Sequence, residues 1–104
     1  MVTPNPPRDT RYVIVHTPGP SWVHGKPVFE QPGVQAHVEY FRGLRDQGKL
    51  ALGGPFLDAG GGGMMIPTSG LSRDEVTAFA NADPAIASGL LRVEVREWMI
   101  GMKG

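Results

Sequence analysis

The chain contains no cysteine, which excludes disulfide bridges, a thiol nucleophile and a thiolate metal site from this sequence. It also lacks any apolar run near the ~20 residues that a helix needs to cross a bilayer. The first ten residues, MVTPNPPRDT, have no hydrophobic signal core. We therefore expect a cytoplasmic protein with no membrane partner.

An excess of charge is missing as well. Ten lysine and arginine residues balance ten aspartate and glutamate residues, so the formal net charge at pH 7 is zero. Proteins that hold nucleic acid or an anionic membrane by electrostatic attraction need an excess of positive charge. We therefore expect neither of these partners.

What the chain does contain is enough apolar material for one small domain. Its 104 residues are 40% hydrophobic, a size and composition typical of one packed unit. Residues 1–10 carry three prolines and almost nothing to bury, and we predict that they form a flexible tail. The single domain is then expected to span residues 11–104.

Residues 33–56, GVQAHVEYFRGLRDQGKLALGGPF, organise the rest of the chain. Apolar side chains in the first half fall within roughly 60° of one another when each residue turns the chain by about 100°. They are Val34, Val38, Phe41 and Leu44. Gly48 follows, where a left-handed residue commonly ends a helix. We predict a helix over residues 34–47 and a strand over residues 49–56.

One histidine, His37, lies inside the apolar stripe of this helix, about 40° from Phe41. A side chain that titrates near neutral pH is unusual in that position, which makes His37 a candidate functional residue. The alternative is a histidine at the edge of the core, bonded to one backbone carbonyl. Arg45, at the edge of the same stripe, either extends outward to solvent or faces an anionic group.

Gly53, Gly54 and Pro55 interrupt the strand that follows. Such a segment permits a bulge or a close approach of the backbone to a ligand. A bent strand without a ligand is an equal alternative. Because proline has no N–H to donate, we expect this end of the strand at an edge of the sheet.

The rest of the chain supplies three more strands and a second helix. Residues 11–16 read as a strand that is apolar on both faces, which predicts cover on both sides. The long connection at 17–32 is either a binding loop or a surface loop pinned by its aromatic residues. We also predict a hairpin turn at 57–63, strands at 64–67 and 89–100, and a helix at 73–81 capped by Ser72.

The order strand, helix, strand, strand, helix, strand predicts the α+β class and the ferredoxin-like βαββαβ fold, with a four-stranded antiparallel sheet. Two helices cover only one face of that sheet, so the apolar side chains on the other face need a partner. We expect a second copy of the chain, packed sheet to sheet as a dimeric α+β barrel. Arg92, Glu94 and Arg96 would form ion pairs in or beside this homodimer interface.

The sequence also resembles a known family. The segments AHVEYFRGLRDQGKLALGGPF and ADPAIASGLLRVEVREW are similar to the YCII-related proteins of the dimeric α+β barrel group, and the similarity covers most of residues 11–100. The family pattern is a helix histidine, a strand that ends in Gly-Pro and a late Asp-Pro before the last strand. In this chain these are His37, Gly54-Pro55 and Asp83-Pro84.

The resemblance implies a His37–Asp83 pair in a pocket between helix and sheet. Some members of the family resemble dehydrochlorinases that act on chlorinated hydroxyquinols. Related barrels include muconolactone isomerases and cofactor-free monooxygenases. This chain departs from the compact members in its long 17–32 loop.

Asp83 has an alternative role, because aspartate before a proline at the first helical position is a common helix N-cap. The two roles are compatible, since a carboxylate has several lone pairs. As a partner of His37, Asp83 would fix the imidazole tautomer and leave the other ring nitrogen as a general acid or base. With no serine or cysteine nucleophile evident beside it, the pair favours proton transfer, isomerisation or elimination.

Further residues complete the predicted pocket, which we expect to bind a small molecule without a cofactor; they are His16, Trp22, His24, Gly54, Pro55 and Phe56. A metal site is the rival chemistry, although the spacing of His16, His24 and His37 matches no recognised ligand motif. Two function classes remain open. One is a small cofactor-free lyase, isomerase or dehydrochlorinase-like enzyme, and the other is a non-catalytic binding or accessory homodimer.

Overall fold

The computed structural model describes residues 9–104, so most of the expected flexible tail at residues 1–10 lies outside the described residues. β1 (Asp9–Pro18) pairs with β4 (Leu91–Ile100) along its whole length. β1 is therefore longer than the predicted 11–16. The reason is that β4 offers backbone hydrogen bonds beyond the apolar run from which the strand was predicted.

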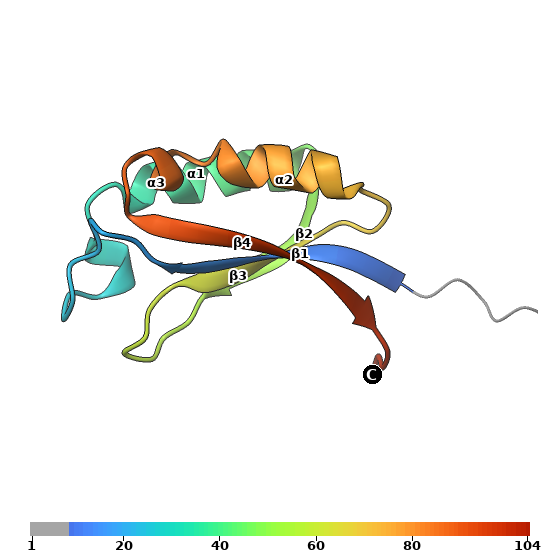
Figure 1. Cartoon of the computed structure of the whole chain (residues 1–104), viewed down its shortest axis with the longest axis horizontal. Helices are drawn as coiled ribbons and strands as arrows, with labels where there is room; N and C mark the ends of the chain where they lie inside the picture. The colour runs from blue at the N-terminus through green and yellow to red at the C-terminus, as the bar shows by residue number, and fades with distance from the viewer. Residues whose placement is uncertain (1–8) are drawn as a thin grey trace, which may run out of the picture.

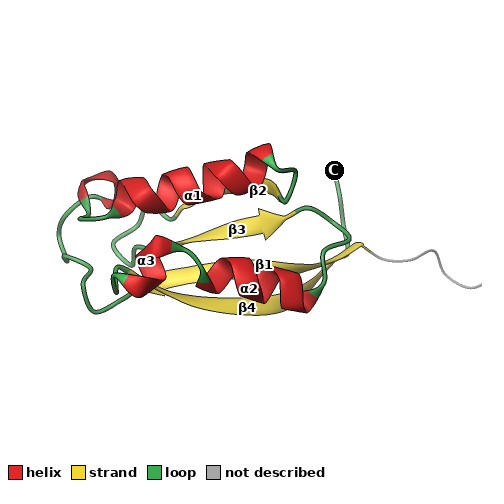
Figure 2. Cartoon of the chain, turned by 90° about the horizontal axis from the view of Figure 1, so that it is seen from above, coloured by secondary structure: helices red, strands yellow, loops and turns green. Residues whose placement is uncertain are grey.

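Between β1 and β4 lie two further strands and four helical segments. In chain order they are η1 (Val28–Glu30), α1 (Val34–Asp46), β2 (Leu50–Pro55), β3 (Gly63–Pro67), α2 (Arg73–Asn81) and α3 (Pro84–Ala87). The sheet has the order β2-β3-β1-β4, and every neighbouring pair of strands is antiparallel. Figure 1 shows α1, α2 and α3 on one face of the sheet, and Figure 2 looks down on this layer. The predicted ferredoxin-like α+β fold is confirmed.

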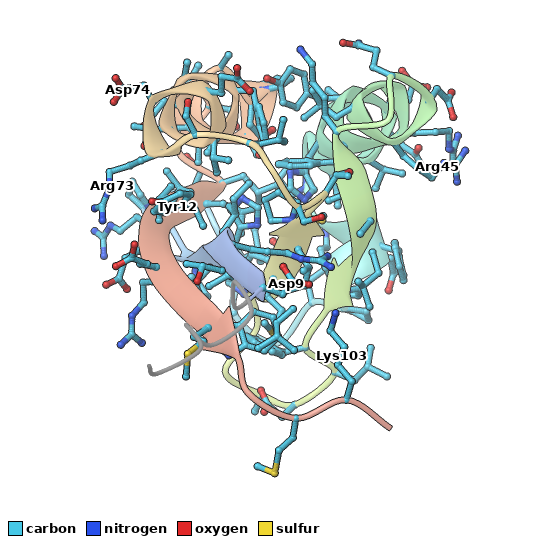
Figure 3. The ribbon with its side chains drawn as sticks, turned by 90° about the vertical axis from the view of Figure 1, so that its right-hand side faces the viewer. Asp9, Tyr12, Arg45, Arg73, Asp74 and Lys103 are labelled. Atoms are coloured by element: carbon cyan, nitrogen blue, oxygen red, sulfur yellow. The ribbon has the colours of Figure 1, made fainter. Side chains whose placement is uncertain are left out.

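Charged side chains hold the start of β1 against the end of the chain (Figure 3). The carboxylate of Asp9 accepts hydrogen bonds from Arg11 at 2.9 Å and from Lys103 at 3.0 Å. These two donors, Arg11 first, lower the pKa of Asp9 to about 2. The contacts tie the first described residue of β1 to the C-terminal segment.

The core lies between the helices and the sheet. Ile14 of β1 and Phe41 of α1 are 0% and 2% exposed, and they pack with Leu44, Val76 and Ala80. Burying a side chain the size of leucine, isoleucine or phenylalanine contributes about 1.5–3 kcal/mol. This cluster therefore fixes α1 and α2 on the sheet, and by fixing α1 it also sets where the remaining residues of that helix lie.

The end of α1 has the geometry that its sequence predicts. Gly48 has a φ of +77°, a conformation that glycine adopts without strain. The N–H groups of Gly48 and Lys49 donate to the carbonyls of Arg45 and Leu44 at 3.0 and 2.9 Å. These two bonds satisfy the last carbonyls of the helix and turn the chain directly into β2.

α2 and α3 are short and begin at polar caps. Ser72 Oγ accepts the N–H of Glu75 at 3.1 Å, and α2 spans Arg73–Asn81, as predicted.

The longest helix of the described residues is α1, with 13 residues. Within residues 9–104, no helix combines the length and the apolar composition needed to cross a membrane.

The other face of the sheet carries polar and apolar side chains together. Val93 and Val95 of β4 pack on the core, so the alternating residues of the strand point away from the helices. Arg92, Glu94 and Arg96 are all exposed there. α1, α2 and α3 all lie on the opposite face (Figure 1), and this second face is the one that we expected to meet a partner.

Candidate active site

α1 and the start of α3 bring a histidine and an aspartate into contact beneath the helices. His37 is 8% exposed on the buried face of α1, and Asp83, which precedes α3, is 0% exposed. His37 Nδ1 lies 2.7 Å from Asp83 Oδ2. When Asp83 is ionised its carboxylate only accepts hydrogen bonds, so Nδ1 is the donor, and in the neutral form of the ring Nε2 keeps its lone pair.

The second oxygen of Asp83 is engaged by its own helix. Asp83 Oδ1 accepts the N–H of Ala85 at 2.9 Å, and Pro84 occupies the first position of α3. The carboxylate is thus both the N-cap of α3 and the partner of His37, so the two alternative roles coexist. The cap holds the carboxylate in one orientation, with Oδ2 directed at the imidazole.

A second buried histidine, His16 of β1, faces the same carboxylate. Its Nε2 lies 3.7 Å from Asp83 Oδ2, beyond hydrogen-bonding distance, and has no hydrogen-bond partner among residues 9–104. Burial, and after it the neighbouring His37, lowers the pKa of His16 to about 4, while Asp83 opposes the shift. His16 is therefore uncharged at pH 7. Its ring meets that of His37 edge to face, with centroids 5.1 Å apart.

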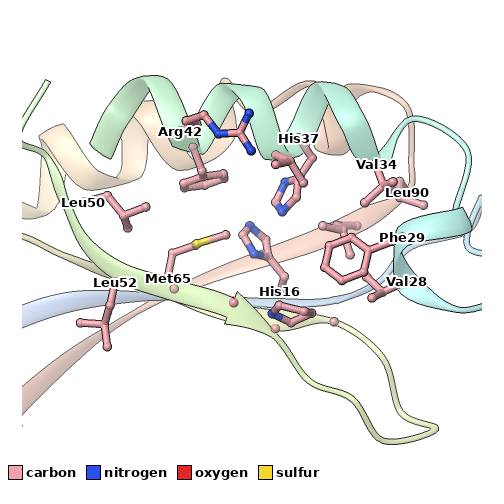
Figure 4. Close-up of a pocket in the computed structure, with 18 of the residues that line it drawn as sticks. His16, Val28, Phe29, Val34, His37, Arg42, Leu50, Leu52, Met65 and Leu90 are labelled. Atoms are coloured by element: carbon pink, nitrogen blue, oxygen red, sulfur yellow. The ribbon is translucent and has the colours of Figure 1, made fainter. Parts of the chain in front are cut away.

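A cavity of about 380 Å³ lies between α1 and the sheet, and both histidines line it (Figure 4). Ligand pockets commonly measure about 300–1,000 Å³, so this one suits a molecule built on a single ring. β2 contributes its whole length, Leu50–Pro55, to one wall. The apolar side chains of the lining include Trp22, Val28, Phe29, Val34, Phe41 and Met65.

Four of the six residues expected to bind a ligand line this cavity: His16, Trp22, Gly54 and Pro55. The structure places His24 and Phe56 outside the lining. His24 is exposed in the turn before η1. Phe56 follows the last residue of β2, is 41% exposed, and donates its N–H to the carbonyl of Gly62. Hairpin pairing, rather than the apolar character of Phe56, decides where that side chain lies.

Comparison with known proteins now places this arrangement in a family. The YCII-related domain matches residues 10–99. The chain belongs to the YCII-related family. This YCII-related chain is also 35% identical over 72 residues to a protein named Uncharacterized protein YjpA from Bacillus subtilis (strain 168). That match covers 69% of this chain and 82% of the relative. No solved structure matches the chain significantly. The family resemblance seen in the sequence is confirmed.

The 17–32 loop of this YCII-related chain forms part of the cavity wall through Trp22, Val28 and Phe29. Gln31, only 3% exposed, fixes the loop. Its side-chain amide accepts the N–H of Val23 and donates to the carbonyls of Val23 and Lys26, each at 2.8 Å. Sequence reasoning missed Gln31, because a glutamine between a glutamate and a proline carries no sign that three backbone groups will converge on it.

The glycine run after β2 lets the β2–β3 hairpin approach the cavity wall, and the predicted turn is confirmed. Gly62 has a φ of +76°, and a Cβ there would lie 2.2 Å from the carbonyl oxygen of His16. At Gly61, a Cβ would lie 2.7 Å from the ring of Trp22. Side chains at these positions would therefore push the hairpin away from two residues that line the cavity.

The same residues form a possible ligand set for a metal ion. Nitrogen atoms of His16 and His37 and an oxygen of Asp83 lie within 4.8 Å of one another. Two imidazoles and one carboxylate suit zinc or another first-row divalent ion. The fold thus gathers His16 and His37, as a metal site would require, but leaves His24 outside. The absence of a metal stays a prediction.

Proposed function

We propose that this YCII-related protein is a small cofactor-free enzyme, a lyase or isomerase with dehydrochlorinase-like chemistry, that moves protons on a small cyclic or aromatic molecule. One observation carries the proposal: the buried 2.7 Å contact between His37 Nδ1 and Asp83 Oδ2 beside a largely apolar cavity. The contact leaves Nε2 of His37 as a candidate general base. An apolar cavity also keeps water away from a reactive ring.

In the proposed reaction, His37 removes a proton from a ring carbon, and the electrons of the broken C–H bond form a double bond. Asp83 stabilises the imidazolium that results. In an isomerisation the adjacent double bond of the substrate breaks, and its electrons take the proton back from the imidazolium at the far carbon. In an elimination a leaving group such as chloride departs with its bonding electrons, and the proton is later released to water. His16, being uncharged, does not repel the imidazolium.

We also propose that the working form is a homodimer joined through the face of the sheet opposite the helices. The support is that α1, α2 and α3 all lie on one face of the sheet (Figure 1). Trp98 lies on the other face, and 42% of its surface is exposed to solvent. Large apolar surface of this kind is commonly covered by a partner. The exposed Glu94 and Arg96, 4.0 Å apart, would border that interface.

Replacing His37 by glutamine tests the enzymatic proposal. We expect turnover of a responsive substrate, found in a panel of chlorinated hydroxyquinols and unsaturated lactones, to fall by about 10²–10⁴-fold. The far-ultraviolet circular dichroism spectrum should stay unchanged. His24→Gln is the matched control, since His24 is exposed and outside the cavity lining, and it should retain full activity. Undiminished turnover in His37→Gln would exclude the proposal.

The second candidate is a non-catalytic, small-molecule-binding or accessory homodimer. Its specific support is that Asp83 caps α3, so that the His37 contact serves only to join α1 to α3. In that case His37→Gln lowers the unfolding free energy by about 1–3 kcal/mol, and no member of the substrate panel is consumed by the wild-type protein. Turnover and unfolding measurements on the same variant therefore separate the two candidates.

A further inference from the structure

The polar side chains that line the cavity are all cationic or imidazole groups. They are His16, His37, Arg42 and Arg45, and no aspartate or glutamate of residues 9–104 joins them. The chain as a whole is balanced, with ten basic and ten acidic residues. Among the described residues, the charged side chains of the lining are therefore two arginines with no carboxylate among them, although the net charge of the protein is zero.

Arg42 and Arg45 are the solvent-exposed charged residues of the cavity lining. Both are exposed residues of α1, whereas His37 is buried in the same cavity. Figure 4 shows Arg42 on the helix above the cavity, with Met65 on the opposite wall. Arg45 is already paired, because its guanidinium lies 3.1 Å from Asp46. Arg42 forms no salt bridge within residues 9–104.

The spacing along α1 sets the length of a molecule that would reach both ends. Arg42 is five residues beyond His37, which corresponds to about 7.5 Å along the helix axis. The two side chains leave α1 about 140° apart around its axis but line the same cavity, so a single ring with an acidic substituent fits between them: the ring carbon meets His37 while the substituent reaches the arginine. A guanidinium binds a carboxylate through two parallel hydrogen bonds, a geometry that lysine cannot provide.

We propose that the cavity recognises its substrate as an anion, a single-ring compound whose carboxylate or phenolate oxygen pairs with Arg42. This inference rests on the proposed function only in placing the reacting ring carbon of the substrate at His37. The binding of the anion at Arg42 does not depend on it. Arg42 is then the residue that determines specificity for charge. Arg45 adds to the positive field at the opening, and the apolar walls hold the ring.

Benzoate and benzamide test this proposal, because they share a ring and a planar substituent and differ in charge. We expect the wild-type protein to bind benzoate about ten times more tightly than benzamide by ligand-observed NMR titration. Arg42→Gln should weaken benzoate binding about tenfold and leave benzamide binding unchanged. Arg73→Gln removes the same charge from α2, where Arg73 lies over the Tyr12 ring (Figure 3), and should change neither affinity.

Three results would overturn the anion site: equal binding of the two probes by the wild type, retention of the benzoate preference in Arg42→Gln, or a Kd for benzoate above about 10 mM. The His37→Gln protein separates this inference from the proposed function. It should keep the benzoate preference even as turnover falls. Full turnover in His37→Gln with an intact benzoate preference would remove the enzyme mechanism and leave the anion site standing.

Discussion

At the residue scale, the two carboxylate oxygens of Asp83 serve different purposes: one makes a local helix-cap bond and the other makes a tertiary contact. The bond from Ala85 to Oδ1 spans two residues, whereas the bond from His37 to Oδ2 spans 46. The first belongs to any Asp-Pro helix start. The second exists only because α1 and α3 pack side by side on the sheet. A local cap therefore prepares the carboxylate that the tertiary structure then uses.

His16 gives a prediction about acid stability. Its pKa is about 4 in the folded protein, below the ordinary value of 6.5, so the unfolded chain takes up the proton first as pH falls. The stabilisation is complete above pH 6.5 and is lost progressively between pH 6.5 and 4. The expected loss is about 3 kcal/mol, measured by denaturant unfolding at a series of pH values.

His16→Leu is the comparison for that measurement, since leucine does not titrate. As pH falls through this window, the unfolding free energy of the wild type should decrease relative to that of the variant. A difference that stays constant from pH 7 to pH 4 would show that His16 does not carry the acid sensitivity. Carboxylates that titrate in both proteins cancel in this comparison.

At the element scale, two glycines predict opposite effects of substitution by alanine, because one is crowded and the other has open space around it. Gly62→Ala introduces a side chain at φ +76° and against the carbonyl of His16, so we expect a loss of at least about 2 kcal/mol. Gly43→Ala lies within α1 with nothing within 4 Å of the added methyl group. It should stabilise the protein by about 0.5–1 kcal/mol. Thermal unfolding of both variants checks the opposite signs.

The elements also show where sequence patterns are reliable. The 73–81 helix has the predicted bounds, because its cap, its charged first turn and its apolar spacing all lie within the segment. β1 extends two residues further at each end than its apolar run, since pairing with β4 continues past it. Local signals thus predict a helix more closely than a strand, whose limits depend on a distant partner.

At the scale of the whole molecule, the proposed homodimer can be measured directly. Sedimentation equilibrium at micromolar concentration should give twice the 11.2 kDa mass of one chain. Trp98→Glu places a charge on the face opposite the helices and should shift the protein toward the monomer. Val23→Glu is the control, because Val23 is also 42% exposed but lies in the 17–32 loop. A wild-type protein that sediments as one chain would exclude the dimer.

The sequence by itself determined the elements, their order and therefore the ferredoxin-like fold, because helix caps, glycine stops and apolar periodicity act over a few residues. Helical spacing singled out His37, and the family pattern paired it with Asp83. Only the tertiary structure decided that His16 joins them and His24 does not, that Gln31 holds the 17–32 loop, and that Arg42 lines the cavity. Gln31 acts by holding the loop rather than by lining the cavity. These placements depend on how α1 and the loop before it settle on the sheet, and contacts between distant segments leave no local trace in the chain.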